Sequence, residues 1–257
     1  MGILNVTPDS FYDGGRFRNT SSVMRQVDQM LEEGATFIDI GAYSSKPNAE
    51  DVSQTEELQR ILPVVELIVK NFPNVLLSVD TFRSEVAEQC IKAGACMIND
   101  ISAGHLDTNM LETVAKLHVP YIMMHMRGTP KTMQQQTHYN DLVKDMLFYF
   151  SERIEKARAL GIIDLVIDPG FGFAKTLEQN FELLSKLELL NITELPVLVG
   201  VSRKSMIYKT LNSSAEEALN GTTVIHTLAL QKGANILRAH DVKEAMECIK
   251  LTQQLHK

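Results

Sequence analysis

The stretch GATFIDIGA at residues 34–42 carries the pattern that decides the fold. A charged stretch with helical spacing runs up to the glycine, and a short apolar run follows it. The same order recurs in GACMINDIS (94–102), GIIDLVIDPG (161–170) and GANILRAHD (233–241). Glycine lacks a Cβ atom and therefore readily adopts the left-handed conformation that commonly ends a helix. The recurrence predicts helices that each end directly before a strand.

Eight short apolar runs are predicted as strands, and helical patterns separate them. Pro120 and Pro196 open two of the runs, at a strand position that needs no backbone donor. The predicted strands are Met1–Val6, Phe37–Gly41, Val75–Asp80, Met97–Asp100, Tyr121–His125, Leu165–Asp168, Val197–Val201 and Ile236–His240. Apolar residues at i, i+3 and i+4 spacing predict helices over Ser22–Glu33, Gln54–Asn71, Arg83–Ala93, Asn109–Leu117, Tyr139–Leu160, Leu177–Leu189, Ala215–Lys232 and Val242–His256.

Strict alternation of strand and helix predicts a parallel sheet. Eight such units in 257 residues fit a closed barrel, which typically needs about 250 residues. An open, doubly wound sheet fits less well, because no GxGxxG turn follows the first strand. We therefore predict an α/β fold, a single (β/α)₈ TIM barrel in which residues 1–257 form one domain.

Composition excludes some classes of protein. The net charge of −7 argues against a nucleic-acid or membrane-surface binder, which would carry a basic stripe. The three cysteines lack metal-ligand spacing and are expected to be reduced thiols. No run approaches 18 apolar residues, and the chain does not open with a charged and then apolar leader. These features predict a cytoplasmic protein.

A polar residue stands at or just after the end of every predicted strand. In a barrel of this kind the carboxyl ends of the strands form the active face. Aspartate and asparagine also cap helices and turns, so any one of these residues has a second explanation. Polar residues at all eight strand ends of one barrel together favour a functional site. The residues are Asn5, Asp39, Asp80, Asn99, His125, Asp168, Ser202 with Lys204, and Arg238 with His240.

These residues fall into two chemical sets. Asp80, Asn99 and Asp168 offer acceptors suited to a flat, donor-rich heterocycle, because a carboxylate can accept two parallel N–H bonds. The second set is cationic and suits an anion such as a phosphate; it contains Lys204, Arg238 and His240, with Lys46 and Arg203 nearby. Together the sets predict a ligand with a heterocycle at one end and phosphates at the other. The Asn5 oxygen is a candidate ligand for a magnesium ion that accompanies the phosphates.

Two long segments follow the first two strands. Thr7–Asn19 and Ala42–Ser53 are rich in Gly, Pro, Ser, Asp and Asn, and both exceed the usual two to six residues of such connections. We predict two mobile lids that close on a substrate. Ordinary surface loops are the alternative.

Several segments together resemble the signatures of the dihydropteroate synthases. The first is GILNVTPDSFYDGG at residues 2–15, and the resemblance extends over the whole chain in family order. The remaining segments are DIGAYSSKPN (39–48), SVDTFR (78–83), IND (98–100), DPGFGFAK (168–175), VSRKS (201–205) and RAHDV (238–242). The resemblance implies an enzyme that joins a dihydropterin methyl diphosphate to p-aminobenzoate and yields 7,8-dihydropteroate and diphosphate in folate biosynthesis.

The resemblance also implies residue roles. Asn5 would hold Mg²⁺ on the diphosphate, Arg238 and His240 would bind the diphosphate, and Lys204 would contact the pterin beside the aminobenzoate. Asp80, Asn99 and Asp168 would bind the pterin. Phe173 and Ser205 would help to form the aminobenzoate site. Lid residues would close over the second substrate, and Asp13 among them could stabilise a cationic intermediate; these residues are Phe11, Asp13, Ser45, Lys46 and Pro47. A homodimer through the late helices and competition by sulfonamides are also implied.

The second lid departs from the family pattern. Where the family usually reads Ser-Thr-Arg-Pro-Gly, this chain has Ser44, Ser45, Lys46, Pro47 and Asn48. Lysine keeps the charge but lacks the planar fork of arginine, which predicts weaker sulfonamide binding than in relatives with the usual loop.

Three other functions remain open from the residues. A pterin-dependent methyltransferase shares a barrel and pterin-gripping carboxylates, but it needs no diphosphate site, so the VSRKS and RAHDV segments count against it. A Schiff-base aldolase would use Lys204 as its amine. A pterin-binding protein without activity would bind pterin diphosphate and release no diphosphate.

Overall fold

A computed structural model describes residues 1–6, 16–43 and 52–256. Six parallel strands form one sheet in the order β1 to β6, and two more form a second sheet. The strands are β1 (Gly2–Asn5), β2 (Phe37–Gly41), β3 (Leu76–Asp80), β4 (Met97–Asp100), β5 (Tyr121–Met124), β6 (Leu165–Asp168), β7 (Leu198–Val199) and β8 (Ile236–Leu237). Parallel bridges join the two sheets at both edges, from Ile167 to Val197 and from Gly2 to Ala239. Each strand therefore has neighbours on both sides, as the predicted (β/α)₈ barrel requires.

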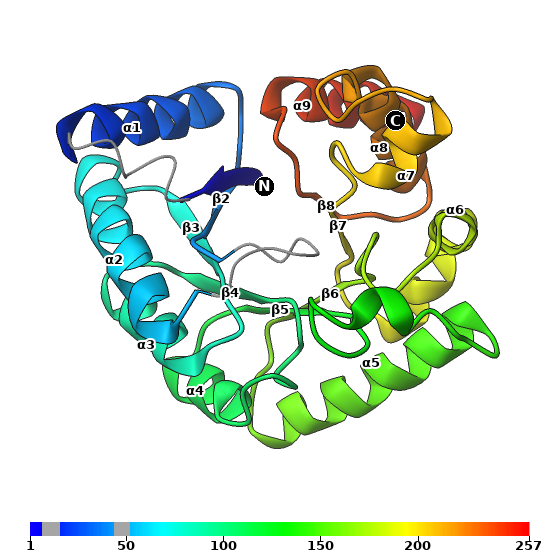
Figure 1. Cartoon of the computed structure of the whole chain (residues 1–257), viewed down its shortest axis with the longest axis horizontal. Helices are drawn as coiled ribbons and strands as arrows, with labels where there is room; N and C mark the ends of the chain where they lie inside the picture. The colour runs from blue at the N-terminus through cyan, green and yellow to red at the C-terminus, as the bar shows by residue number, and fades with distance from the viewer. Residues whose placement is uncertain (7–15, 44–51, 257) are drawn as a thin grey trace.

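Helices surround the strands on the outside (Figure 1). They are α1 (Arg16–Glu32), α2 (Gln54–Asn71), α3 (Ser84–Lys92), α4 (Met110–Leu117), α5 (Leu142–Ala159), α6 (Leu177–Ser185), α7 (Ser205–Thr210), α8 (Leu219–Gln231) and α9 (Val242–Gln253). Short 3₁₀ turns cover Met133–Gln135, Leu187–Thr193 and Gln254–His256. None of the helices in the described part of the chain is long and apolar enough to cross a membrane.

The apolar residues of the strands divide between two faces. Outward residues such as Ile98 and Ile167 join the large core beneath the helices, whereas Met97, Ile122, Val166 and Leu198 form a separate cluster. Phe37 and Ile236 pack against this inner cluster. Side chains alternate along a strand, so the residue two positions further on shares the same face.

This alternation builds a polar layer above the inner apolar cluster. Four polar residues each follow a member of this inner cluster, or a residue packed against it, by two positions. They are Asp39 after Phe37, Asn99 after Met97, Asp168 after Val166 and Arg238 after Ile236. Asp80 joins them at the end of β3, where it pairs in register with Asn99. We call these five residues the polar layer. Hydrophobic packing thus fixes which strand positions present polar groups at the carboxyl-terminal rim, meaning the carboxyl ends of the strands.

Some predicted boundaries differ from the structure. Helix α1 begins at Arg16 rather than Ser22, so the first predicted loop is shorter than Thr7–Asn19. Helix α7 was not predicted, because six residues are too short to show helical periodicity, and α8 begins at Leu219 rather than Ala215. Strands β7 and β8 contain two residues each, since only those make regular ladder pairs. Both predicted lids fall largely on 7–15 and 44–51, outside the described residues.

Candidate active site

Arg238 ties three strands together in the polar layer. Its Nε atom donates to Asp39 Oδ2 at 2.6 Å, and one terminal nitrogen donates to Asp80 Oδ2 at 2.8 Å. The same Asp39 oxygen accepts from Asn99 Nδ2 at 2.9 Å. Asp39 and Asn99 are buried, and Arg238 and Asp80 are each about one-fifth exposed. A continuous network therefore links the predicted heterocycle set to the predicted anion set.

Charges in this layer act on one another over the whole rim. Burial raises the pKa of Asp80 to about 7, although Arg238 acts in the opposite direction. Burial also raises the pKa of Asp168, while Lys204 and Arg238 act to lower it. Arg238 and the Lys204 Nζ both lie within 4.0 Å of the Cβ position of Gly200, and both charges act on Asp168, so all three residues lie at the same end of the barrel. This arrangement is the one that a ligand with a heterocycle and a phosphate tail requires.

Asp168 is held at the start of the segment Pro169–Ala174, which we call the β6 loop. Its Oδ1 accepts the Gly170 N–H at 2.7 Å. Gly170 has a φ of +67°, and a Cβ atom there would lie 2.2 Å from the carbonyl oxygen of His125. Only glycine fits this close approach, so the DPG sequence fixes how the backbone leaves the strand.

Lys204 reaches the β6 loop from the start of α7. Its Nζ donates to the Phe171 carbonyl and lies 4.9 Å from the centre of the Phe173 ring. Burial lowers the pKa of Lys204 to about 8, against the opposing effect of Asp168. Ser205 follows as the first residue of α7 and is half-buried. Lys204 therefore lies against the loop that follows Asp168 and close to the Phe173 ring, and Ser205 is its neighbour in the chain.

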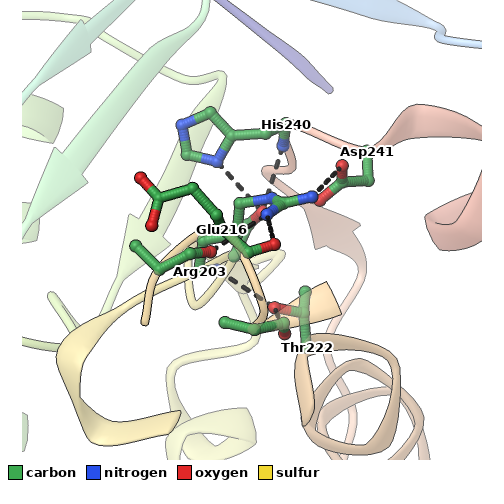
Figure 2. A network of polar contacts seen from close by, with 8 residues as sticks. Arg203, Glu216, Thr222, His240 and Asp241 are labelled. Carbon is green, nitrogen blue, oxygen red and sulfur yellow. Dashed lines mark hydrogen bonds and ion pairs between the residues drawn. The ribbon is translucent and has the colours of Figure 1, made fainter. Parts of the chain in front are cut away.

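His240 is oriented by Ser202. The Ser202 hydroxyl accepts the backbone N–H of His240 at 3.1 Å and lies 3.0 Å from His240 Nδ1 (Figure 2). His240 is exposed and stands two residues after Arg238. Its ring is thus fixed at the rim beside the polar layer.

Arg203 does not belong to the anion-binding set, contrary to the sequence-based expectation. Its guanidinium makes two hydrogen bonds of 2.9 Å to the Asp241 carboxylate and also donates to the carbonyls of Ala215 and Glu216 (Figure 2). Arg203 has a φ of 54°, in the left-handed region. This cation therefore clamps the segment before α8, and its neighbour Lys204 faces the site.

Asn5 ends β1 with an exposed side chain at the same rim. It pairs in register with Gly41, directly beside the strand that carries Asp39. Among the described residues no group of three or more His, Cys, Asp or Glu could hold a metal ion. Phe11, Asp13, Ser45, Lys46 and Pro47 lie outside the described residues, so their predicted roles stay predictions.

Two features of the site had no assigned role in the sequence. Asp39 appeared only as a strand-end residue, yet it is the buried partner of both Asn99 and Arg238. Lys175 closed the DPGFGFAK segment, and its Nζ lies buried against His125 and the β6 loop. The period-two pattern marks Asp39 as an inner residue, but no sequence signal shows that Lys175 is buried.

Comparisons with known proteins agree with this geometry. The family model described as "Pterin binding enzyme" matches residues 1–240. The dihydropteroate synthase of Escherichia coli K12 is 44% identical over 255 residues, which is 98% of this chain and 90% of the relative. The Yersinia pestis dihydropteroate synthase, solved with a sulfonamide drug, has a TM-score of 0.93 and 44% identity, covering 100% of this chain and 93% of that one.

A third relative has been solved with one of the predicted substrates. The Xanthomonas albilineans dihydropteroate synthase with 4-aminobenzoic acid has a TM-score of 0.91 and 40% identity, and covers 100% of this chain and 92% of that one. Matches of this extent span both the polar layer and the β6 loop. The chain belongs to the pterin-binding enzyme family, among the dihydropteroate synthases.

Proposed function

We propose that the protein catalyses the condensation of (7,8-dihydropterin-6-yl)methyl diphosphate with p-aminobenzoate. The products are 7,8-dihydropteroate and diphosphate. The observation that carries this proposal is the polar layer, where buried acceptors and a guanidinium meet at one rim. Asn99 and Asp168 are 4% and 6% exposed, and both Asn99 and Arg238 donate to the same Asp39 oxygen.

The acceptors of the polar layer suit the pterin ring. Asp168 Oδ1 accepts one backbone N–H, and the rest of its carboxylate can accept from the amino-pyrimidinone edge. Asn99 and Asp80 provide further groups on the neighbouring strands. A hydrogen bond to a desolvated carboxylate contributes about 1.5–3 kcal/mol. These contacts orient the exocyclic methylene that reacts.

The cations suit the departing diphosphate. We propose a dissociative substitution in which the C–O bond to diphosphate breaks before the C–N bond to the amine forms. The electron-rich ring bears the developing positive charge, while Arg238 and His240 stabilise the leaving group. The arylamine is largely unprotonated at pH 7, so no strong base is needed, and its proton leaves after the C–N bond forms. Asp13 would help stabilise the cation or position the first lid.

Mg²⁺ is the proposed cofactor. A hard cation takes oxygen ligands, and phosphates and water can supply most of them. The exposed Asn5 amide at the rim fits the role of one protein ligand. When bound, the ion would neutralise charge on the diphosphate.

The second substrate would lie beside the β6 loop. Phe173 offers an aromatic face, Ser205 a hydroxyl, and Lys204 a cation close to that face. Sulfonamides would compete for this position, as the ligand of the Yersinia pestis relative suggests. The lid residues, among them Lys46, would complete the pocket.

We also propose a homodimer of one-domain subunits in the cytoplasm. Val224 and Leu228 lie one turn apart on α8 and are 52% and 40% exposed, and Leu251 on the adjacent α9 is 73% exposed. Such an apolar face on the late helices would be covered in a dimer. The three cysteines are free thiols, as expected in a reducing compartment.

One coupled assay tests the proposed reaction. Purified protein is mixed with the pterin diphosphate, p-aminobenzoate and Mg²⁺, and product mass and diphosphate release are followed. We expect dihydropteroate and diphosphate in equal amounts. Pterin binding without aminobenzoate-dependent diphosphate release would indicate a binding protein. Methyl transfer from a methylated pterin, or trapping of a carbonyl substrate on Lys204 by borohydride, would indicate the other two alternatives.

A further inference from the structure

The carbonyl groups of the β6 loop are held by side chains. Gly170, Gly172 and Ala174 have positive φ angles, so this backbone is neither helix nor strand. Carbonyls of Gly170 to Ala174 each accept a hydrogen bond from a side chain. The donors are Lys175 for Gly170 and Phe173, Lys204 for Phe171, Gln134 for Gly172 and Tyr139 for Ala174. Because buried carbonyls need partners, these donors stabilise this conformation.

Lys175 makes the most contacts beneath the loop. Its Nζ donates to the carbonyls of Gly170 and Phe173 at 3.0 Å each and lies 3.2 Å from His125 Nδ1. The protonated amine has three donors for these three acceptors, and the neutral amine still has two donors for the two carbonyls. Lys175 is only 4% exposed, which is unusual for lysine.

His125 is suited to accept the third bond. The ring is buried among Tyr139, Tyr149 and Phe150, and burial together with the Lys175 charge lowers its pKa well below the usual value. The ring is therefore neutral, and its Nδ1 can accept the lysine N–H. His125 follows β5, so this contact anchors the β6 loop to the neighbouring strand.

We propose that Lys175 is a positioning residue that fixes the β6 loop and thereby sets Phe173 and Lys204 for the second substrate. Lys175 donates to the carbonyls of Gly170 and Phe173. These two residues flank Phe171, whose carbonyl accepts from Lys204. Removal of the Lys175 amine would leave the carbonyls of Gly170 and Phe173 without this donor. The inference rests on the proposed synthase function, because Phe173 and Lys204 are assigned to p-aminobenzoate there.

The pterin side of the site has its own support. The Asp168 carbonyl accepts the backbone N–H of His125 at 2.9 Å, and Asp168 pairs in register with Met124. Strand pairing therefore holds the Asp168 backbone without Lys175, and close packing against the His125 carbonyl holds Gly170, whose N–H bonds to the Asp168 carboxylate. A perturbed loop should weaken binding of p-aminobenzoate much more than binding of the pterin.

The test compares the wild-type protein with Lys175→Met. Methionine keeps a side chain of similar length but lacks the amine. We expect the KM for p-aminobenzoate to rise at least about tenfold, with a lower kcat. The Kd of pterin diphosphate alone, measured by calorimetry, should change by less than about threefold. Arg153→Met is the matched control, because Arg153 is also a buried cation but packs against Gly104. It should leave both constants near wild type even if the Tm falls.

A milder variant keeps the test decisive if Lys175→Met does not fold. Tyr139→Phe removes one hydroxyl, which donates to the Ala174 carbonyl at 2.9 Å. It should raise the KM for p-aminobenzoate about twofold to fivefold and leave the pterin Kd unchanged. An unchanged KM in a folded Lys175 variant, or an equal loss for both substrates, would overturn the proposal, as would an unchanged KM for Tyr139→Phe. An inactive wild type would instead contradict the synthase function.

Discussion

The polar layer and the β6 loop stand side by side at one rim but are held in different ways. In the polar layer, side chains hold side chains: Arg238 and Asp39 meet although 199 positions separate them in sequence. In the β6 loop, side chains hold the main chain, and donors such as Lys175 bond to carbonyls. The first region therefore depends on charge balance, and the second on backbone conformation. Substitutions in the two regions should fail in different ways.

The largest effect is expected from Arg238→Met. Loss of a preorganised cation at the leaving group should lower kcat about 10²–10³-fold. Asp39, fully buried, would lose its charged partner, so the free energy of unfolding should fall by about 3–5 kcal/mol. Urea unfolding and steady-state kinetics measure the two losses.

A double variant separates these two losses. Asp39→Asn combined with Arg238→Met removes the unpaired buried charge, so much of the stability should return while turnover stays low. Recovery of turnover together with stability would show that Arg238 acts only on the fold.

Gly170→Ala probes the main-chain character of the β6 loop. The new Cβ would lie 2.2 Å from the His125 carbonyl oxygen in a left-handed backbone, and unfolding free energy should fall by about 2–4 kcal/mol. Gly161→Ala is the control, because its φ is also positive but no atom lies within 4 Å of the new Cβ. The unfolding free energy of Gly161→Ala should fall by only about 1–2 kcal/mol. Equal losses at the two glycines would refute the close-approach argument.

Asp168→Asn should affect binding more than stability. The amide oxygen can still accept the Gly170 N–H, so unfolding free energy should change by less than about 1 kcal/mol. Loss of the carboxylate should lower kcat/KM for the pterin diphosphate about 10–100-fold. Asp164→Asn, an exposed change just before the same strand, serves as the control. If both variants kept wild-type kinetics, Asp168 would not grip the pterin.

The smallest effect concerns pH. Burial lowers the pKa of Lys175 from 10.5 to about 7, so the folded state releases this proton while the unfolded state keeps it. Stability from this group therefore rises with pH between about 7 and 10 and is constant below 7. From pH 7 to pH 8 this amounts to about 1 kcal/mol, so the Tm of wild type should gain about 2–4 °C relative to Lys175→Met. Parallel Tm curves would show that Lys175 is not held in a desolvated site.

The comparison also explains what the sequence could predict. Glycines at helix ends and short apolar runs predicted all eight strands, because the helix–strand junction recurs along the chain and the strands are buried. Their places at the ends of predicted strands then identified Asn99 and Asp168 as rim residues. In the polar layer the sequence did not predict which side chains pair. Asp39 and Arg238 both lie on the inner face, but only barrel closure, which joins β8 to β1, brings Arg238 within reach of Asp39 on β2.

The β6 loop was less predictable. Lys175 ends a polar-looking segment, and its burial follows from left-handed turns whose carbonyls need donors. The adjacent cations Arg203 and Lys204 could not be told apart either, since one backbone conformation at Arg203 decides which of them faces the site. The six-residue α7 was missed for a similar local reason. Irregular backbone, rather than apolar pattern, sets these details.

A crystal structure of the protein with the pterin diphosphate and Mg²⁺ tests the central claim most directly. We predict the amino-pyrimidinone edge within hydrogen-bond distance of the Asp168 carboxylate and the phosphates beside Arg238 and His240. A ligand whose ring or phosphates bind away from the polar layer would contradict the account.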